Sequence, residues 1–157
     1  MHDVLLILPV VGPPNLYTVP RGSLQGQDLK WYRRLTRVPQ GLLSIGSWLE
    51  QHGFSVKLFD SRLHLLRGPQ GLEDDLRTEI RETRLFVGIS VLTMHIAQAL
   101  EISRVVKEEN PNLLVVWGGV HPTLFPEQTA ADPLVDFVVQ GVGEAPLLGL
   151  ANIFGDN

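Results

Sequence analysis

Small polar residues and glycines follow two successive apolar segments of this sequence. Ser90 and Thr93 close one segment, and Gly118 and Gly119 close the next. Two adjacent glycines permit a positive φ and remove Cβ atoms where another group approaches the backbone. A nearby hydroxyl group can donate a hydrogen bond to a ring nitrogen or an amide. The combination favours close approach of a ligand; the alternatives are a tight turn at the glycines and helix N-capping by Thr93.

A second pair of glycines lies in the phrase Gly141-Val142-Gly143-Glu144. A helix N-terminus behind this phrase can accept an anion or a polar group. Glu144 in the first turn is also explained by the helix dipole. The phrase resembles half of a dinucleotide fingerprint, but the loop after the first apolar segment contains only Gly12 among prolines and an asparagine, and no phosphate-loop motif occurs. Nucleotide binding is therefore poorly supported.

The five histidines show no metal-binding pattern. No two of them are three or four positions apart, so we expect no metal held by side chains of this chain. His2 is expected to be terminal and idle, His52 to cap the C-terminal end of a helix, and His64 to lie in a loop. His95 and His121 fall near the glycines, where His121 is expected to make a polar contact that orients a loop or an amide.

Composition restricts the possible functions. The 157 residues are 44% hydrophobic and 19% charged, which predicts one soluble globular domain over residues 1–157. A net charge of −4 argues against a nucleic-acid partner. The chain has no cysteine, so it cannot hold an iron–sulfur cluster by thiolates. It has neither a signal peptide nor an apolar run of about 20 residues, so we expect a cytoplasmic protein without membrane contact.

A self-contained catalytic set is not visible in the sequence. No Gly-x-Ser-x-Gly phrase occurs. The acidic clusters at residues 73–75 and 108–109 are predicted to be solvated charge on helix faces. We therefore expect no catalysis by this chain alone.

Apolar strands alternate with helices along the chain. Strands are expected at residues 4–8, 54–59, 85–91, 113–117 and 134–139, and helices at 41–52, 71–83, 96–109 and 144–153. Strands that are almost wholly apolar are typical of a parallel sheet covered on both faces. The sequence thus predicts a doubly wound, five-stranded α/β domain, flavodoxin-like or Rossmann-like, with strand order 2-1-3-4-5. In such sheets ligands bind beyond the carboxyl ends of the strands, where the glycines described above fall.

Residues 9–39, after the first strand, form a long segment rich in proline and glycine. An irregular segment of this length inside a compact domain is usually functional or disordered. Trp31, Tyr32 and the following arginine pair are interpreted as a lid or partner surface, or as a small surface helix.

Several phrases together resemble the cobalamin-binding domains of radical S-adenosylmethionine enzymes. Ser90-Val91-Leu92 followed by Gly118-Gly119 is similar to the Ser-x-Leu and Gly-Gly elements of cobalamin-binding domains. The phrases from Gly118 to Thr123 and from Val135 to Glu144, in this order, resemble the radical enzyme family specifically. The resemblance implies cobalamin-binding positions at Pro9, Val10, Gly12, Pro39, Leu42, Ser90, Leu92, Thr93, Gly118, Gly119, His121, Pro122, Thr123, Gly141, Gly143 and Glu144.

Two departures refine what the resemblance implies. Methyltransferase-type cobalamin domains carry Asp-x-His-x-x-Gly after the first strand, whereas this chain has Pro9-Val10-Val11-Gly12 there. The implied state is base-off cobalamin without a histidine lower ligand. Val142 stands where the radical family usually has an acidic residue, which removes one charge near the pocket for the nucleotide tail.

The resemblance also separates this chain from the chemistry of a complete enzyme. S-Adenosylmethionine and a four-iron cluster, held by Cys-x-x-x-Cys-x-x-Cys, would belong to another domain, acting in cis or in trans. We expect this chain to be the cofactor-binding part of a methyltransferase-like enzyme or a stand-alone cobalamin carrier.

The alternative is a flavodoxin-like regulatory or sensor module that signals when cobalamin or another ligand binds. A receiver domain is a poorly supported form of this alternative. Receiver domains need acidic residues at the ends of the first and third strands, and here these strands end in Pro9 and Ser90.

Overall fold

One parallel sheet organises the molecule. The computed structural model describes residues 1–10, 38–64 and 68–155. The sheet has the order β2-β1-β3-β4-β5, and every neighbouring pair is parallel. Its strands are β1 (His2–Leu8), β2 (Val56–Asp60), β3 (Thr83–Ser90), β4 (Leu114–Gly118) and β5 (Phe137–Val138). This confirms the predicted fold class and strand order.

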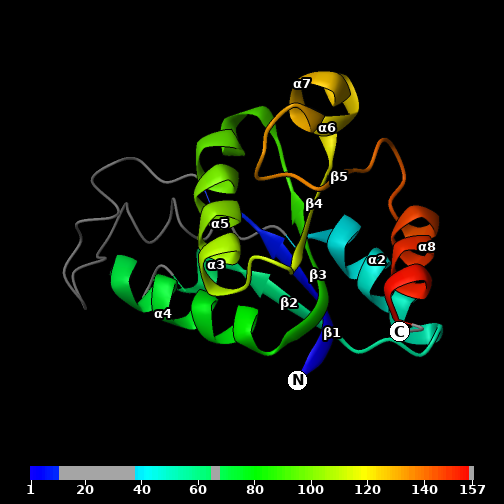
Figure 1. Cartoon of the computed structure of the whole chain (residues 1–157), viewed down its shortest axis with the longest axis horizontal. Coiled ribbons are helices and arrows are strands. Elements are labelled where there is room, and N and C mark those ends of the chain that lie inside the picture. Colours follow the sequence, from blue (N-terminus) through cyan, green and yellow to red (C-terminus); the bar gives the residue numbers. More distant parts are fainter. Residues whose placement is uncertain (11–37, 65–67, 156–157) are drawn as a thin grey trace.

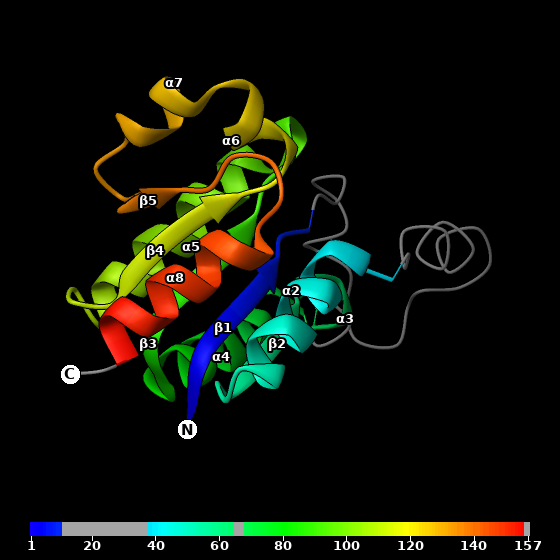
Figure 2. The same cartoon turned by 90° about the vertical axis from the view of Figure 1, so that its right-hand side faces the viewer.

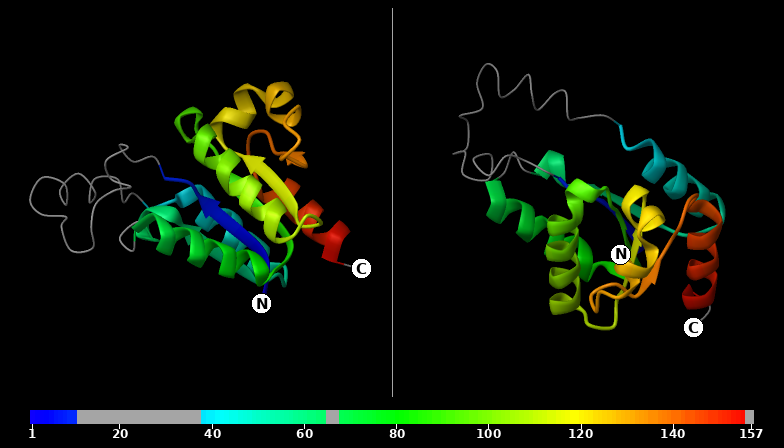
Figure 3. Two further views of the ribbon diagram at one scale, coloured as in Figure 1. Left: turned by 60° about the vertical axis from the view of Figure 1, so that its left-hand side comes forward. Right: turned by 90° about the horizontal axis from the view of Figure 1, so that it is seen from above.

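Helices cover both faces of the sheet (Figures 1 and 3). The helical elements are α2 (Gln40–Gln51), α3 (Ser61–His64), α4 (Gly68–Arg81), the 3-10 turn η3 (Thr93–His95), α5 (Ile96–Glu109), α6 (Val120–Leu124), α7 (Pro126–Ala130) and α8 (Glu144–Gly155). Helices α2 and α8 lie on one face, and α4 and α5 lie on the other. Within the described ranges, none of these helices combines the length and apolar character needed to cross a membrane.

The side chains of each strand point alternately to the two faces of the sheet, and this explains why the strands are apolar throughout. In β1, Leu5 and Ile7 pack in the core shared with α4 and α5, while Val4 and Leu6 pack in the core shared with α2 and α8. All four are fully buried. Successive strand residues point to opposite faces, so a sheet covered on both sides buries both sets. Each such side chain contributes about 1.5–3 kcal/mol of burial free energy.

The segment between β4 and β5 differs from the prediction (Figure 2). The expected strand at residues 134–139 is wrong at both ends, because β5 contains only Phe137 and Val138. It lies at the edge of the sheet and pairs with β4 alone. The Asp136 amide donates to the Val115 carbonyl (2.9 Å) and the Val139 amide donates to the Trp117 carbonyl (2.8 Å), so the pairing with β4 continues past both ends of β5. The two short helices α6 and α7 precede it and were not expected.

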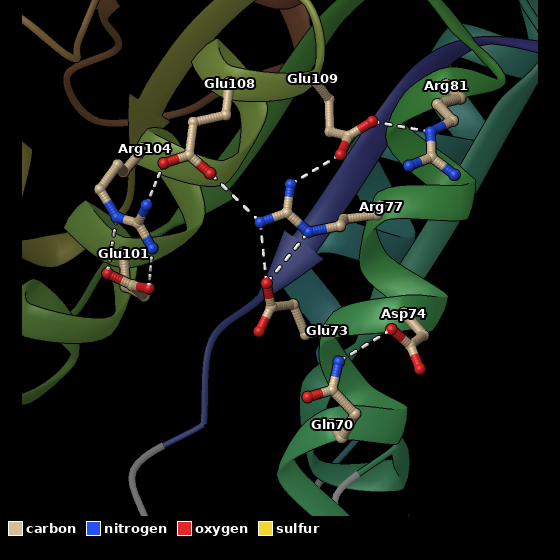
Figure 4. A network of polar contacts seen from close by, with 9 residues as sticks. All are labelled: Gln70, Glu73, Asp74, Arg77, Arg81, Glu101, Arg104, Glu108 and Glu109. Carbon is tan, nitrogen blue, oxygen red and sulfur yellow. Dashed lines mark hydrogen bonds and ion pairs between the residues drawn. The ribbon is translucent and has the colours of Figure 1, made fainter.

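The acidic clusters lie on helix faces as predicted, but Glu73, Glu108 and Glu109 are also ion-paired with arginines and are not solvated charge alone (Figure 4). The Arg77 guanidinium lies 2.8 Å from a Glu73 oxygen, 3.1 Å from Glu108 and 2.6 Å from Glu109. These carboxylates raise the pKa of Arg77, with Glu109 the largest cause. Arg81 also contacts Glu109, at 2.7 Å. The network joins α4 to α5. The pattern of charges within each helix could not predict it, because it depends on how the two helices pack together.

Two histidines differ from their predicted places. His2, expected to be idle, is buried in β1, and its Nε2 lies 2.8 Å from Thr83 Oγ1. His64 lies in the short helix α3 and not in a loop. Its ring stacks on Phe59 and its Nδ1 lies 2.7 Å from an Asp75 carboxylate oxygen. His52 is the C-cap of α2, as predicted.

Candidate functional site

A cavity of about 300 Å³ lies between the sheet and the helices α2 and α8. Its walls come from strands β1, β3 and β4, from the residues after β4 and β5, and from the two helices. Among the described residues that line it, only Ser90 and Glu144 have polar side chains, and the others are glycines and aliphatic residues. They are Leu6, Gly41, Leu42, Ile45, Gly88, Ile89, Ser90, Val116, Gly118, Gly119, Val139, Gly141, Val142, Gly143, Glu144 and Leu147.

The two adjacent glycines of the wall have different roles. Gly118 pairs with Ser90 across β3 and β4, and a Cβ added to it would meet Val139 at an ordinary 3.7 Å. Gly119 has φ +102° and ψ −164°, a conformation that is open almost only to glycine. A Cβ at Gly119 would lie 3.0 Å from the backbone N and O of Val91. Gly118 thus leaves space in the cavity, and Gly119 permits the close approach of two backbone segments.

Backbone hydrogen bonds continue beyond the ends of β3 and β4. The Val91 amide donates to the Gly118 carbonyl at 2.8 Å, and the His121 amide donates to the Val91 carbonyl at 3.0 Å. Both the amide and the carbonyl of Val91 are therefore hydrogen-bonded to the segment that ends β4 and follows it. This pairing fixes Ser90, which precedes it, at the wall of the cavity.

His121 and Thr123 support the wall and do not line it. The His121 ring is buried, and its Nδ1 lies 3.3 Å from Thr93 Oγ1 on the neighbouring turn. Thr123 Oγ1 donates to the Gly119 carbonyl at 2.7 Å and accepts from the Gly141 amide at 2.9 Å. These bonds join the segments that follow β3, β4 and β5. The Thr93 contact replaces the predicted N-cap, since His95 is the N-cap of α5 and no side chain caps it.

Glu144 connects the two helices at the mouth of the cavity. It is the first residue of α8, where a carboxylate complements the helix dipole. Its Oε1 accepts a hydrogen bond from Ser44 Oγ of α2 at 2.6 Å. The remaining carboxylate oxygen is available to accept a hydrogen bond from a ligand group, since a carboxylate offers about four lone-pair sites.

The structure brings seven of the predicted binding positions together at the cavity. They are Leu42, Ser90, Gly118, Gly119, Gly141, Gly143 and Glu144. Pro9 and Val10 are buried after β1, Pro39 is the N-cap of α2, Leu92 is 40% exposed, and Pro122 is buried in α6. These five, with Thr93, His121 and Thr123, do not line the cavity. Gly12 lies outside the described residues.

Part of the wall was not predicted from the sequence. Gly41 and Ile45 are one helical turn apart on α2, and Gly88 lies in the interior of β3. A glycine inside an apolar strand often marks a close approach to the backbone, and this signal could have identified Gly88. The aliphatic residues carried no such signal, because their pattern is that of any buried face.

We expect His95, which lies beside the site, to make the stability of the fold depend on pH. Burial, the largest cause, lowers the pKa of His95, and Leu92 donates its amide to Nδ1 at 3.5 Å. A lowered folded pKa means that the unfolded state binds more protons as pH falls below about 6.5. We expect thermal unfolding at a lower temperature at pH 5.5 than at pH 7.5. His95→Gln should reduce that difference, although His2, whose pKa burial also lowers, should preserve part of it; an unchanged difference would contradict the assignment.

The chain matches one family model and several known proteins. The family model described as B12 binding domain matches residues 34–151, about three quarters of the chain. An anaerobic magnesium-protoporphyrin IX monomethyl ester cyclase of Synechocystis is 36% identical over 120 residues, 71% of this chain and 22% of that protein. The protein of the same name from Rubrivivax gelatinosus is 34% identical over 80 residues, 50% of this chain and 14% of that protein.

A third relative has a different name. An uncharacterized methyltransferase of Pyrococcus horikoshii is 41% identical over 59 residues, 37% of this chain and 13% of that protein. The matched region thus covers less than a quarter of each of these relatives. No solved structure matches the chain significantly.

Proposed function

Because this chain belongs to the B12 binding domain family, we propose that the cavity holds the nucleotide tail of cobalamin in the base-off state. Ligand pockets usually measure about 300–1,000 Å³, and this cavity lies at the lower end of that range. Its size suits the dimethylbenzimidazole tail and not the whole cofactor. The corrin ring would then lie outside, over the carboxyl ends of the strands.

The chemistry of the wall fits a flat heteroaromatic group. Glycine and aliphatic residues provide an apolar wall, and Gly118 leaves the space of a side chain open within it. Ser90 offers a hydroxyl donor for a ring nitrogen, and Glu144 offers a carboxylate for a ligand hydroxyl or amide. This cradle of glycines with two convergent polar groups is the observation that carries the proposal.

The described residues near the site support a cofactor without a histidine lower ligand. Pro9 and Val10, which follow β1, carry no ligating group. His121 is buried against Phe125, with ring centroids 5.1 Å apart, and its Nδ1 lies beside Thr93. His95 accepts a hydrogen bond from the Leu92 amide. Both rings are thus engaged inside the protein, His121 through Nδ1 and Phe125, and His95 through hydrogen bonds with the Leu92 and Ser90 backbone.

We place the chain in a larger catalytic assembly in the cytoplasm. The relatives are named as a cyclase and a methyltransferase, and the matched region is a small part of each. In that assembly, a radical S-adenosylmethionine domain would supply the four-iron cluster and S-adenosylmethionine, since this chain has no cysteine. Cobalamin would supply a cobalt-bound methyl group or a redox-active cobalt. The role of this chain is to bind and orient it.

The coordination state is tested by absorption spectroscopy with methylcobalamin. We expect binding with the spectrum of base-off cobalamin, and His95→Gln and His121→Gln should leave that spectrum unchanged. Binding with a spectrum typical of a nitrogen lower ligand would overturn the base-off proposal. A spectrum that changes only in a histidine variant would identify that histidine as a ligand.

A variant of Ser44 provides a second test, because Ser44 holds Glu144 at the wall of the cavity. Ser44→Ala removes the hydroxyl that holds Glu144, so we expect the affinity for cobalamin to fall about three- to tenfold, the value of one hydrogen bond. The control is Ser47→Ala, an exposed position on the same helix that does not line the cavity. Equal affinities of the two variants in an equilibrium titration would show that Glu144 does not need Ser44.

A further inference from the structure

Three potential metal ligands converge at the amino end of β1, where the chain enters the sheet. His2 begins β1, Glu79 lies near the end of α4, and Glu82 lies between α4 and β3. One ligand atom from each of the three lies within 4.8 Å of the others. This end of the strands is opposite to the cavity, so the cluster is independent of the proposed cobalamin site.

The hydrogen bonds around His2 determine which ring nitrogen carries the proton. Thr83 Oγ1 donates its single hydrogen to the Glu79 carbonyl at 2.8 Å. The same oxygen lies 2.8 Å from His2 Nε2, so it must accept a hydrogen from that nitrogen. In the neutral ring, Nδ1 therefore carries a lone pair.

That lone pair faces a carboxylate. Nδ1 lies 4.0 Å from Oε2 of Glu79, and the His2 side chain is only 9% exposed. Two acceptors that face each other in a buried place are stabilised by a proton, a water molecule or a cation between them. Because Nδ1 is too far from Oε2 for a direct hydrogen bond, the space between them is suited to an ion.

We propose that His2, Glu79 and Glu82 bind a divalent transition-metal ion of the zinc type. Zinc takes one histidine nitrogen and carboxylate oxygens at about 2.0–2.2 Å, usually with tetrahedral geometry, and water can complete the set. Such ligand atoms lie about 3.3 Å apart, so the three groups must approach one another by at most about 1.5 Å. The Glu82 side chain is 54% exposed and free to make most of this movement.

Two ammonium groups compete with the metal. Lys57 Nζ lies 3.0 Å from Oε1 of Glu79, and the Met1 amine lies 3.5 Å from Oε2 of Glu82. The Lys57 side chain is 48% exposed and can turn to solvent. Oε2 of Glu79, which faces His2, is not the oxygen that Lys57 contacts. Removal of the Lys57 charge should therefore strengthen metal binding.

The test is calorimetric titration of the cofactor-free, untagged chain with Zn²⁺ alone, together with thermal unfolding. We expect one site, and a Tm raised by about 5–10 °C at a hundredfold excess over Kd. His2→Gln and Glu82→Gln should each weaken binding at least about tenfold, and Lys57→Met should strengthen it. Glu82 is exposed, so its variant keeps the test valid if His2→Gln does not fold.

His64→Gln is the matched control, because His64 Nδ1 lies 2.7 Å from a carboxylate oxygen of Asp75, a second histidine–carboxylate pair among the described residues. It should leave the titration unchanged. The proposal is overturned if Zn²⁺ does not bind, if Glu82→Gln binds it as tightly as the parent chain, or if His64→Gln abolishes binding. Cobalamin binding should be unaffected by Zn²⁺, so failure here is distinguishable from failure of the proposed function.

Discussion

Replacement of Gly118 by valine is expected to abolish cobalamin binding while the chain stays folded. Gly118 ends β4 with an ordinary strand conformation, because it is not among the described glycines with positive φ. A Cβ there meets only Val139 at 3.7–3.8 Å, and β-branched residues suit strands. The added methyl groups would occupy the cavity beside Ser90. We expect the affinity for hydroxocobalamin to fall at least about 100-fold in an equilibrium titration.

The control for this variant is Gly149→Val. Gly149 lies on α8, does not line the cavity, and has open space around the position of a Cβ. This variant should bind cobalamin as the parent chain does, with some loss of helix stability. If Gly118→Val binds cobalamin with unchanged affinity, the tail does not enter this cavity.

Replacement of Gly119 by alanine should have the second largest effect, on the stability of the fold. A residue with a side chain is strained at φ +102°, and the new Cβ would lie 3.0 Å from two backbone atoms of Val91. Backbone atoms cannot rotate away as the end of a side chain can. We expect the free energy of unfolding, measured by urea denaturation, to fall by about 1–3 kcal/mol. The affinity for cobalamin should fall as well, because Ser90 precedes the displaced Val91.

Gly149→Ala is the matched control for this second prediction. Its Cβ meets nothing within 4 Å, so an alanine there should be neutral or stabilise α8 by up to about 1 kcal/mol. Equal unfolding free energies for Gly119→Ala and Gly149→Ala would mean that the turn after β4 does not require glycine.

The fold could be predicted because its determinants are local. The continuous apolar segments around Leu5, Val87 and Val115 require cover on both faces, and this requirement led to the parallel sheet. Helix α5 was predicted at its observed limits because Pro111, one residue beyond Asn110, ends the helical pattern. The helices α6 and α7 were missed because each has only five residues, too short to show a hydrophobic period.

The candidate site was predicted in part for a similar reason. Gly118 and Gly119 are visible in sequence because two adjacent glycines after an apolar strand mark either a tight turn or a close approach to the backbone. The contact of His121 with Thr93 and the two bonds of Thr123 depend on which loops meet in space. The same is true of His2, whose partner Thr83 is 81 positions away. Residue types alone could not show that those side chains contact other parts of the protein and do not contact a ligand.

The central claim, that the cavity receives the nucleotide tail, is tested most directly by comparing cobalamin with cobinamide, which has the corrin ring but lacks the tail. Equilibrium titrations of the full chain with both compounds measure what the tail contributes. We expect cobalamin to bind at least about 100-fold more tightly, and Gly118→Val to remove that preference. Equal affinity for the two compounds would contradict the account, because it would show that the cavity beside Ser90 and Gly118 plays no part in binding.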